Sequence, residues 1–456
     1  MNKTDFKSLE LSEEMLHNLN EIGYTHMTPI QEESLPHILA GLDVIAQAKT
    51  GSGKTAAFGI GLLSKLHVKK FKVQSLVLCP TRELADQVAK ELRMLARFAH
   101  NIKILTICGG VAFGPQLGSL RHGAHIIVGT PGRVLKHLKK ETLCLDDLEM
   151  LVLDEADRML DMGFSEEINE VLEFVPKTRQ TLLFSATYTD EIMDISASIQ
   201  KNAINVKTVS TEVANKIVER FYDVSNSQKL EVLINILSNF NPQNVIVFAN
   251  TKAEVQEIAQ TLQKNRIDAL AIHGDLEQYE RVDVLVQFAN KSCPVLVATD
   301  VAARGLDIKE LAMVINYDVP HTEEIYTHRI GRTARAGAEG LAFTLMGQYE
   351  RDKADEYKNE NRIFEDAATL KTIGGFEMKP KNITLVIEGG KKDKVRAGDI
   401  LGALTGEAGI GGEFVGKIDI YDKQSYVAID ASKVDEAHER LKNGKIKGKK
   451  FSIWIL

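Results

Sequence analysis

The sequence of 456 residues predicts an α/β protein with two tandem parallel-sheet domains and a small α+β domain at its C-terminal end. Two blocks, residues 20–205 and 244–344, each alternate short apolar runs with amphipathic stretches. This alternation is typical of a parallel sheet that is covered by helices on both faces. Near residue 381 the order of strand-like and helix-like runs changes, which indicates a separate module.

Apolar runs give the expected strands of the two large domains. In the first block they are residues 43–46, 75–79, 102–107, 125–129, 150–153 and 181–184. In the second block they are residues 244–248, 269–273, 295–298, 313–316 and 341–344. The apolar periodicity weakens over residues 205–216, so we expect a linker there. Residues 348–376 are strongly charged and predict a terminal helix followed by a connector.

The last segment predicts strands and helices in a mixed order. The strands are residues 383–387, 415–421, 425–429 and 451–455, and the helices are residues 397–406 and 432–442. The order β-α-β-β-α-β is the split βαβ arrangement that RNA-recognition modules use. We therefore expect three domains, which cover residues 1–207, 216–372 and 380–456.

Bulk composition narrows the class of protein. Apolar residues make up 44% and charged residues 26%, and no apolar run approaches the roughly 20 residues that a bilayer-spanning helix needs. The N-terminal stretch lacks the apolar core of a signal peptide, and the four cysteines lie far apart, which favours reduced thiols in a cytoplasmic protein. The net charge is −7, yet residues 380–456 carry fourteen Lys and Arg against eleven Asp and Glu. A basic tail on an acidic body suggests a separate anion-binding module.

A glycine-rich stretch, AQAKTGSGKT at residues 46–55, lies between a predicted strand and a helix-like segment. Gly51 and Gly53 allow a tight turn whose N–H groups can point at phosphate oxygens, and the following helix adds the positive end of its dipole. Lys54 can then reach the β- and γ-phosphates, and the Thr55 hydroxyl can hold Mg²⁺. Ala48 departs from the strict pattern G-x-x-x-x-G-K-[ST], so a Gly- and Ser-rich turn with a chance lysine is the alternative.

A second motif, DEAD at residues 154–157, follows the predicted strand 150–153. An apolar strand that delivers carboxylates beside a phosphate loop is a Walker B arrangement, in which Asp154 holds Mg²⁺ through its water shell. Glu155 would orient the attacking water and accept its proton. The four letters alone also fit a solvated helix start, but their pairing with Lys54 and Thr55 favours a nucleoside triphosphatase.

Many further motifs occur in a fixed order, and together they resemble DEAD-box ATP-dependent RNA helicases over residues 6–345. The first block holds Phe6, Gly23, TPIQ (28–31), the phosphate loop, PTRELA (80–85), Gly109-Gly110, TPGR (130–133), DEAD and SAT (185–187). The second block holds VIVFAN (245–250), HGD (273–275), ATDVAARGLDI (298–308) and HRIGRTARAG (328–337). The resemblance implies two RecA-like domains, with a Q motif at about residues 4–32, that bind ATP and Mg²⁺. This family also has alanine at the position of Ala48.

The resemblance implies roles in the nucleotide site. The expected ATP-binding residues are Phe6, Gln31, Ala48, Lys49, Thr50, Gly51, Ser52, Gly53, Lys54, Thr55, Asp154 and Asp307, with Thr55 and Asp154 at the metal. The expected catalytic residues are Glu155, Lys54, Arg332 and Arg335. Gln31 suits the adenine edge, and Phe6 can stack on the base, with a core position as its alternative. Because both arginines belong to the second block, we expect hydrolysis to require closure of the two blocks.

The resemblance also implies RNA contacts in the two blocks. The expected residues are Arg82, Gly110, Thr130, Arg133, Thr251, Thr299 and Arg304. Hydroxyls, glycine N–H groups and arginines form hydrogen bonds with phosphates and sugars. These contacts therefore account for RNA binding, but not for a preference for one RNA sequence. For the three threonines a turn or cap role is the alternative. The SAT stretch is expected to couple the nucleotide site to RNA.

The C-terminal segment narrows the resemblance to DbpA-type helicases. The match lies in the run of residues 389–410 and in GKIDIY, SYVAID and NGKIKGKKF, and Ala334 replaces the glycine of most DEAD-box members. The RRM-like module of that subfamily binds a hairpin of 23S ribosomal RNA. The expected contacts are two basic clusters, Lys391, Lys392, Lys394 and Arg396, and Lys447, Lys449 and Lys450, with a solvated lysine face as the alternative. Strands 383–387 and 425–429 carry only Tyr426 as an aromatic, with a core position as its alternative, so we expect recognition through loops and helix ends.

The sequence therefore predicts an RNA-stimulated ATPase that unwinds short RNA duplexes and is targeted to 23S rRNA during assembly of the large (50S) ribosomal subunit. We expect a monomer in the cytoplasm that binds RNA and no membrane. One alternative is an ATP-gated RNA clamp or assembly scaffold without productive unwinding. A second alternative, a P-loop NTPase with a non-nucleic substrate, is disfavoured by TPGR, PTRELA and the paired arginines.

Overall fold

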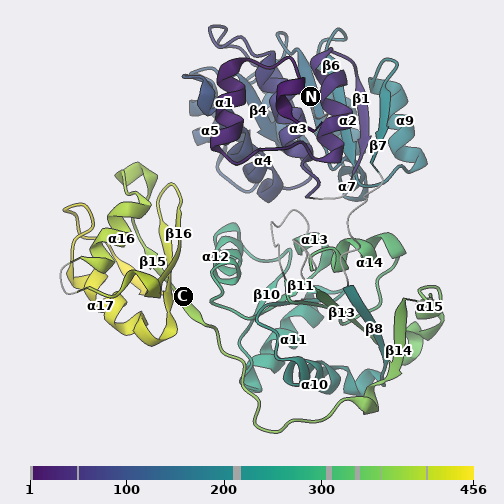
Figure 1. The fold of residues 1–456 in the computed structure, drawn as a ribbon, viewed down its shortest axis with the longest axis vertical. Helices are drawn as coiled ribbons and strands as arrows, with labels where there is room; N and C mark the ends of the chain where they lie inside the picture. The colour runs from purple at the N-terminus through teal and green to yellow at the C-terminus, as the bar shows by residue number, and fades with distance from the viewer. Residues whose placement is uncertain are drawn as a thin grey trace. The chain divides into compact units, whose positions relative to one another are not determined.

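Three β-sheets organise the part of the chain that the computed structural model describes, namely residues 4–48, 51–208, 217–303, 311–333, 339–359, 361–406 and 409–456. The chain divides near residue 212 into two compact units. The first unit contains a seven-stranded sheet, and the second contains a seven-stranded and a four-stranded sheet (Figure 1). The predicted architecture, two tandem parallel-sheet domains and a small α+β domain, is confirmed.

The first sheet is parallel and has the strand order β3-β4-β2-β5-β6-β1-β7. Its strands are β1 Val44–Gln47, β2 Ser75–Leu78, β3 Ile104–Ile107, β4 Ile126–Gly129, β5 Met150–Asp154, β6 Gln180–Ser185 and β7 Ile204–Lys207. All six strands that the apolar runs predict are present. The edge strand β7 occupies the start of the expected linker, and its half-exposed pattern with Asn205 and Lys207 explains why no apolar run revealed it.

Side chains that alternate along these strands build two cores, one on each face of the sheet. On β2, Val77 packs in one core and Leu76 and Leu78 in the other, as the two-residue period of a strand requires. The first core is covered by α1 Glu13–Glu21, α2 Pro29–Leu39, α3 Lys54–Ser64 and α4 Arg82–Leu95. The second is covered by α5 Phe113–Leu120, α6 Pro131–Lys139, α7 Ala156–Asp161, α8 Ser165–Glu173 and α9 Asp190–Ile199. With both faces buried, the ends of the strands are left for function.

The second large sheet is also parallel, with the order β10-β11-β9-β12-β13-β8-β14. Its strands are β8 Ile217–Asp223, β9 Val245–Phe248, β10 Ala269–Ile272, β11 Val295–Ala298, β12 Met313–Asn316, β13 Gly340–Met346 and β14 Arg362–Asp366. Its helices are α10 Lys229–Phe240, α11 Lys252–Lys264, α12 Gln278–Ala289, α13 Asp300–Ala303, α14 Glu323–Ile330 and α15 Arg351–Asp355. None of the helices in the described ranges has the length and apolar content that a membrane crossing needs.

Two strands of this sheet, β8 and β14, were not predicted, and they form one edge of it. Both strands contain charged side chains, so the sequence shows no apolar run at their positions. Arg362 Nε donates to Glu219 Oε2 at 2.7 Å, and Arg220 Nη1 donates to Glu365 Oε1 at 2.8 Å. These cross-strand ion pairs replace the apolar pairs of an interior strand. The segment of residues 348–376 therefore contains the expected helix, α15, and adds strand β14.

The small sheet is antiparallel, with the order β16-β17-β15-β18. It consists of β15 Asn382–Ile387, β16 Val415–Ile420, β17 Ser425–Asp430 and β18 Ile453–Ile455, and it carries α16 Ala397–Thr405 and α17 Val434–Asn443. The predicted β-α-β-β-α-β order is therefore confirmed. One face of the sheet and the two helices enclose a core that includes Leu385, Ile400 and Leu441.

The other face of the small sheet packs against helix α12 of the preceding domain, within the same compact unit. Val386 and Tyr426 of the sheet contact Val282 and Val286 of the helix. The Tyr426 hydroxyl donates to Asp283 Oδ1 at 2.8 Å. Tyr426 is thus buried at 2% exposure, and the face that typical RNA-recognition sheets use for base stacking is covered here.

The connector before this sheet is packed rather than extended into solvent. Leu370, Phe376 and Met378 lie against the core of the second parallel-sheet domain. Met378 also pairs with Ile267 through backbone hydrogen bonds, in which Asp268 N donates to Met378 O at 2.9 Å. Packing of the second domain therefore continues beyond residue 372, where the sequence predicts its end.

Candidate active site and nucleic-acid interface

The phosphate loop joins the end of β1 to the start of α3 in the first domain. Gly53 has φ +93°, a left-handed conformation that glycine adopts readily, and Lys54 and Thr55 open the helix. Lys54 is buried at 6% exposure, and its Nζ donates to Ala48 O at 2.8 Å. Gly51 and Ser52 lie in the turn, whereas Lys49 and Thr50 lie outside the described residues. The strand, turn and helix that a phosphate site needs are all in place.

Gln31 contacts the phosphate loop directly. Its Nε2 donates to Gly53 O at 3.0 Å, and its Oε1 accepts from Thr28 N at 2.9 Å. The side chain is 1% exposed, and a Cβ built at Gly53 would lie 2.5 Å from Gln31 Nε2. Glycine at residue 53 is therefore required both by its φ and by the closeness of this amide. Gln31, which the sequence predicts to contact the adenine edge, thus supports the phosphate loop in the structure.

Asp154 ends strand β5, and Glu155 lies between this strand and helix α7 as the N-cap of the helix. Asp154 is 2% exposed, and its Oδ1 has no hydrogen-bond partner among the described residues. Burial raises the pKa of Asp154 to about 7, against the opposing attraction of Lys54. Glu155 has φ +54°, and its Oε2 accepts from Arg158 Nη1 at 2.7 Å in a buried ion pair. A buried carboxylate oxygen without a partner is chemically suited to a hydrated cation.

The last residue of the DEAD motif connects to the SAT stretch. Asp157 Oδ2 accepts from Ala186 N at 3.0 Å, from Thr187 N at 3.1 Å and from the Thr187 hydroxyl at 3.3 Å. Its Oδ1 accepts from Arg158 N at 3.0 Å. One buried carboxylate thus holds the ends of β5 and β6 together, a physical link that the sequence motifs alone did not specify.

Phe6, which was expected to stack on the base, packs in the core of the first domain. Its side chain is 3% exposed and belongs to the core of the first domain. Its ring lies edge-on to Tyr24, with centroids 6.4 Å apart. The core position given as the alternative is the one observed, because the ring is enclosed by apolar neighbours rather than presented to a ligand.

The expected RNA contacts of the first domain follow three neighbouring strands. Arg82 follows β2, Gly110 follows β3, and Thr130 and Arg133 follow β4. These strands are adjacent in the order β3-β4-β2, so parallel pairing brings their carboxyl ends to one edge. Gly110 has φ +70°, and a Cβ there would lie 2.4 Å from Arg82 Nη1. The nucleotide motifs occupy the other half of the same edge, after β5, β6 and β1.

Arg133 is held in place by Gln116 and by the backbone of Val111, neither of which the sequence analysis predicts. The Arg133 guanidinium donates to Gln116 Oε1 at 3.0 Å and to Val111 O at 2.9 Å. Gln116 Nε2 in turn donates to Cys108 O at 2.9 Å, and His137 Nε2 lies 3.1 Å from Gln116 Oε1. His137 is buried and stacks on Phe113, and burial followed by the charge of Arg133 lowers its pKa to about 4. No local motif reveals this support, because its members come from separate elements.

In the second domain, the expected RNA contacts Thr251 and Thr299 follow β9 and β11, which are neighbours in the sheet. Thr251 Oγ1 accepts from Glu254 N at 3.2 Å, and Thr299 Oγ1 accepts from Ala302 N at 3.4 Å. Both hydroxyls thus have the cap-type hydrogen bonds of the alternative interpretation. Arg304, Asp307 and Arg335 lie outside the described residues.

Arg329 organises the strand ends of this domain. It is 2% exposed, and its Nε and Nη2 donate to Asp300 Oδ1 and Oδ2, both at 2.7 Å. Further bonds reach Asp318 O at 3.0 Å, Asn316 Oδ1 at 3.2 Å and Asn250 Oδ1 at 3.3 Å. One guanidinium therefore joins β9, β12, α13 and α14. Arg332, an expected catalytic residue, follows one turn later, and its N donates to Arg329 O at 3.3 Å.

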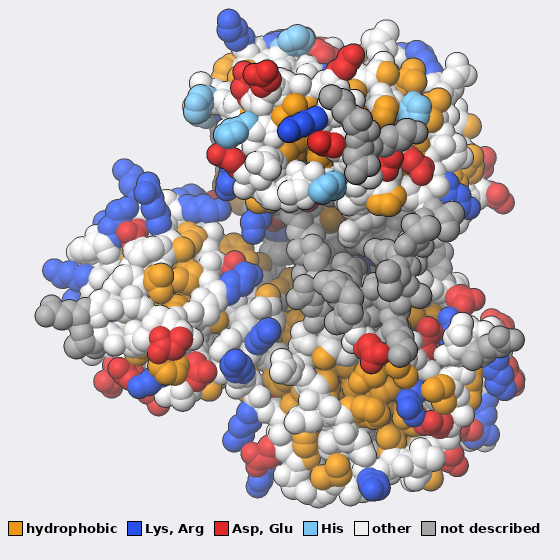
Figure 2. All heavy atoms as spheres, in the orientation of Figure 1, with side chains coloured by type: hydrophobic (Ala, Val, Ile, Leu, Met, Phe, Trp, Pro, Cys, Tyr) orange, Lys and Arg blue, Asp and Glu red, His pale blue; other side chains and the backbone are white. Residues whose placement is uncertain are grey.

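The two predicted basic clusters of the C-terminal domain come together. The members described are Lys391, Lys392, Lys394, Arg396, Lys447, Lys449 and Lys450, all exposed. Lys447 Nζ donates to Lys394 O at 2.8 Å, which joins the two loops. Figure 2 shows Lys and Arg side chains gathered along one end of this domain, at the left of the view. The convergence gives a surface suited to phosphates.

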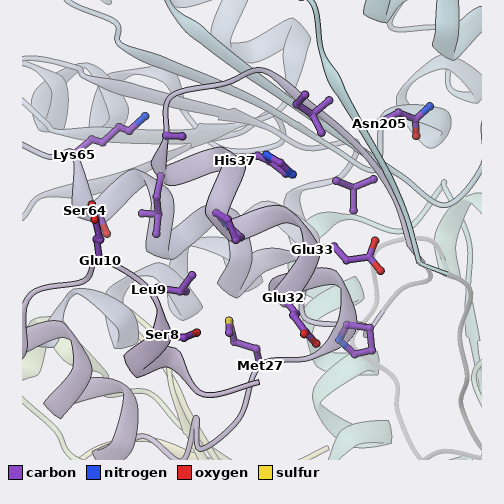
Figure 3. A pocket seen from close by; sticks show the side chains of 16 residues that line it. Ser8, Leu9, Glu10, Met27, Glu32, Glu33, His37, Ser64, Lys65 and Asn205 are labelled. Atoms are coloured by element: carbon purple, nitrogen blue, oxygen red, sulfur yellow. The ribbon is translucent and has the colours of Figure 1, made fainter. Parts of the chain in front are cut away.

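A separate cavity of about 1040 Å³ lies between α2, the C-terminal end of α3 and β7 (Figure 3). Glu32, Glu33 and Lys65 are among its lining residues. Ser64, which also lines it, is ten residues from Lys54, about 15 Å along helix α3. The lining also includes Met27 and Pro29, next to the Thr28–Gln31 segment that contacts the phosphate loop.

Comparisons with known proteins agree with this geometry. Residues 28–195 match the DEAD/DEAH box helicase family, residues 228–337 the helicase conserved C-terminal domain, and residues 384–455 the DbpA RNA binding domain. The chain is 50% identical over 455 residues to the ATP-dependent RNA helicase DbpA of Escherichia coli (strain K12), across 99% of this chain and 100% of that protein. The chain belongs to the DbpA-type DEAD-box RNA helicases. It is accordingly an ATP hydrolase that acts on RNA.

Two further proteins resemble the helicase domains. The DEAD-box ATP-dependent RNA helicase CshA of Bacillus cereus (strain ATCC 10987 / NRS 248) is 46% identical over 373 residues, which covers 80% of this chain and 70% of that protein. A solved structure of S. cerevisiae Dbp5 bound to RNA and ADP BeF3 is 30% identical, with a TM-score of 0.71 over 80% of this chain and 96% of that chain. The predicted RecA-like architecture is therefore confirmed.

Proposed function

We propose that this helicase unwinds short RNA duplexes and is targeted to 23S rRNA during assembly of the large (50S) ribosomal subunit. The observation that carries the targeting is the convergence of two basic loops, joined by Lys447 and Lys394, at one end of the C-terminal sheet. Clustered lysines suit the dense phosphates of a folded RNA. The match of this segment to the DbpA RNA binding domain supports the same assignment.

In the first domain, we propose that Lys54 contacts the β- and γ-phosphates of ATP and that Gln31 reads the adenine edge. Asp154 and Thr55 would hold Mg²⁺, and the buried Oδ1 of Asp154, which has no hydrogen-bond partner in the described part of the chain, fits that role. The cation supplies positive charge beside the phosphates and favours the ionised form of Asp154, whose pKa burial otherwise raises to about 7. The order of strand ends, with β5, β6 and β1 adjacent, supports this grouping.

Glu155 is proposed as the general base for the attacking water. Its ion pair with Arg158 fixes the carboxylate beside Asp154, which supports a positioned base rather than a mobile surface acid. Arg332 and Arg335, from the second domain, would stabilise the charge that develops on the γ-phosphoryl group, an effect worth about 10³–10⁵ in rate in other phosphoryl-transfer enzymes. Turnover would then require both domains, and Asp307 would contact the ribose.

The RNA cycle follows from the same assignment. The C-terminal domain would anchor on ribosomal RNA while the two helicase domains act on a neighbouring duplex. Binding of ATP and RNA closes these domains and bends one strand, and hydrolysis reopens them. The link from Asp157 to Ala186 and Thr187 supports coupling between the nucleotide site and the RNA residues. We further propose a monomer in the cytoplasm, a reducing compartment that suits the four free cysteines.

RNA titrations of ATPase turnover test the targeting. A 23S rRNA fragment should reach half-stimulation at lower concentration than an unrelated RNA of equal length. Replacing Lys391 and Lys447 by Glu should raise that concentration by at least about tenfold for the 23S fragment, because two phosphate contacts become repulsive. Lys381→Glu is the matched control, since this exposed lysine directly precedes β15, at the opposite end of the sheet. Equal stimulation by both RNAs in the parent protein would overturn the targeting.

A further inference from the structure

One stripe of helix α12 faces the C-terminal domain. Val282 and Val286 pack on its sheet, and Asp283 accepts the Tyr426 hydroxyl. Tyr279 lies three and four residues before Val282 and Asp283, so helical geometry places it on the same stripe, one turn toward the N-terminal end. Its side chain is 67% exposed, which is high for an aromatic ring beside a packed interface.

The direction of α12 over the sheet follows from its contacts at the other end. Asn290, just after the helix, donates from Nδ2 to Thr384 Oγ1 at 3.1 Å, and Asn382 Nδ2 donates to Asn290 O at 2.9 Å. Asn382 and Thr384 lie at the start of β15. The C-terminal end of α12 is therefore over the start of β15, and Tyr279 extends toward the end where β15 finishes.

That end of the sheet carries the hairpin between β16 and β17. Strand pairing places Ile387, the last residue of β15, opposite Ser425, so the turn of residues 421–424 projects from this end. Tyr421 begins the turn, is 42% exposed, and places its ring 5.4 Å from Tyr426. Tyr421 and Tyr279 therefore flank the same Tyr426–Asp283 contact, one from each domain.

Lysines of the C-terminal domain lie at the same end, together with the exposed Asp422 of the turn. Lys391 N donates to Tyr421 O at 2.9 Å, and Lys392 N donates to Asp422 O at 3.0 Å, which fixes the first basic loop to the hairpin turn. Lys391, Lys392 and Lys423 are exposed. Exposed aromatic rings among lysines combine a stacking surface for bases with charges for phosphates.

We propose that Tyr279 and Tyr421 form a base-stacking platform for unpaired RNA that adjoins the RNA bound by the C-terminal domain. The platform replaces, at the edge of the sheet, the stacking surface that α12 covers on its face. It deepens the proposed function, because it rests on RNA binding by the basic loops and adds a second domain to that binding. An RNA strand that leaves the folded RNA would thus be held against the second helicase domain.

Fluorescence titration of the full chain tests the platform. The probes are two RNAs, a 23S rRNA hairpin alone and the same hairpin with a single-stranded extension that carries 2-aminopurine. Tyr279→Ala and Tyr421→Ala should each weaken binding of the extended RNA by about 5- to 100-fold and reduce the quenching of 2-aminopurine that stacking causes. Tyr279→Phe and Tyr421→Phe keep the ring and should bind as the parent does. Tyr349→Ala, at an 88% exposed tyrosine elsewhere in the second unit, is the matched control.

The two RNAs separate this inference from the proposed function. Affinity for the hairpin alone should stay within about twofold in the tyrosine variants, because the lysines hold the hairpin. If both alanine variants bind and quench the extended RNA as the parent does, the platform is refuted while targeting stands. If the parent binds the 23S hairpin no better than an unrelated hairpin, the targeting fails, and continued quenching by Tyr279 and Tyr421 would still support the platform.

Discussion

Replacing Asp157 tests the link between the DEAD and SAT motifs. The buried carboxylate accepts four hydrogen bonds, three from Ala186 and Thr187 and one from Arg158 N. Asp157→Ala leaves all four donors without this acceptor, and at about 1 kcal/mol each the first domain should lose roughly 3–5 kcal/mol of stability. Asp157→Asn keeps one carbonyl oxygen as an acceptor and so loses only the hydrogen bonds to the other oxygen. This loss should cost about 1–2 kcal/mol of stability.

Urea unfolding of the first domain and RNA unwinding assays measure the two consequences. The 1–2 kcal/mol lost in Asp157→Asn can destabilise the conformation in which the nucleotide site is coupled to RNA. In that case the unwinding rate should drop by roughly 5- to 30-fold. ATP binding should change little, because the hydrogen bonds of Asp157 go to Arg158, Ala186 and Thr187. Asp194→Asn, at an exposed aspartate of α9, is the control for loss of one charge. Parent-like stability and unwinding in Asp157→Ala would refute the reasoning.

Three further changes follow from the geometry. Gly53→Ala should weaken ATP binding and destabilise the first domain by about 2–4 kcal/mol, because its φ is left-handed and its Cβ would meet Gln31; unaltered ATP titrations and urea unfolding would count against this. His137 has a folded pKa of about 4, below its ordinary 6.5, so the unfolded chain binds the extra proton between these values. Stability should therefore fall by up to about 3 kcal/mol as the pH drops through this window, and urea unfolding at pH 5 and pH 7 should show a smaller fall in His137→Gln. Arg329→Lys should destabilise the second domain by about 3–5 kcal/mol, since it breaks a buried bidentate pair. A double-mutant cycle with Asp300→Asn should be strongly non-additive, and additive losses would contradict the pairing.

Interior strands could be predicted because their chemistry is local. A parallel strand that is buried on both faces must be apolar over its whole length, so runs such as Met150–Asp154 stand out in the sequence. The edge strands β7 and β14, and β8 next to β14, could not be found this way. Their outer side chains reach solvent or form ion pairs such as Arg362 with Glu219, and these pairs depend on a partner strand that is remote in sequence.

The individual positions of aromatic and polar side chains were harder to predict. Phe6 occurs in a motif of the nucleotide site, yet tertiary packing encloses its ring in the core beside Tyr24. Tyr426 was the aromatic candidate on the small sheet, and α12 covers it. Gln116 and His137 belong to no motif, and only the structure shows that Gln116 accepts a hydrogen bond from Arg133 and lies 3.1 Å from His137.

The sequence by itself determined the phosphate loop, the DEAD strand and the order of the three domains. Each of these features depends on contiguous residues, and the positions of glycine, apolar and charged residues set their local conformation. Only the tertiary structure decided which strand ends are neighbours. The order β3-β4-β2-β5-β6-β1-β7 brings Arg82, Gly110 and Thr130 to one half of an edge and the ATP motifs to the other. It also set α12 on the small sheet, which places Tyr279 and Tyr421 at one basic end. Such long-range contacts depend on strand pairing and helix packing between distant segments, and no short stretch of sequence encodes them.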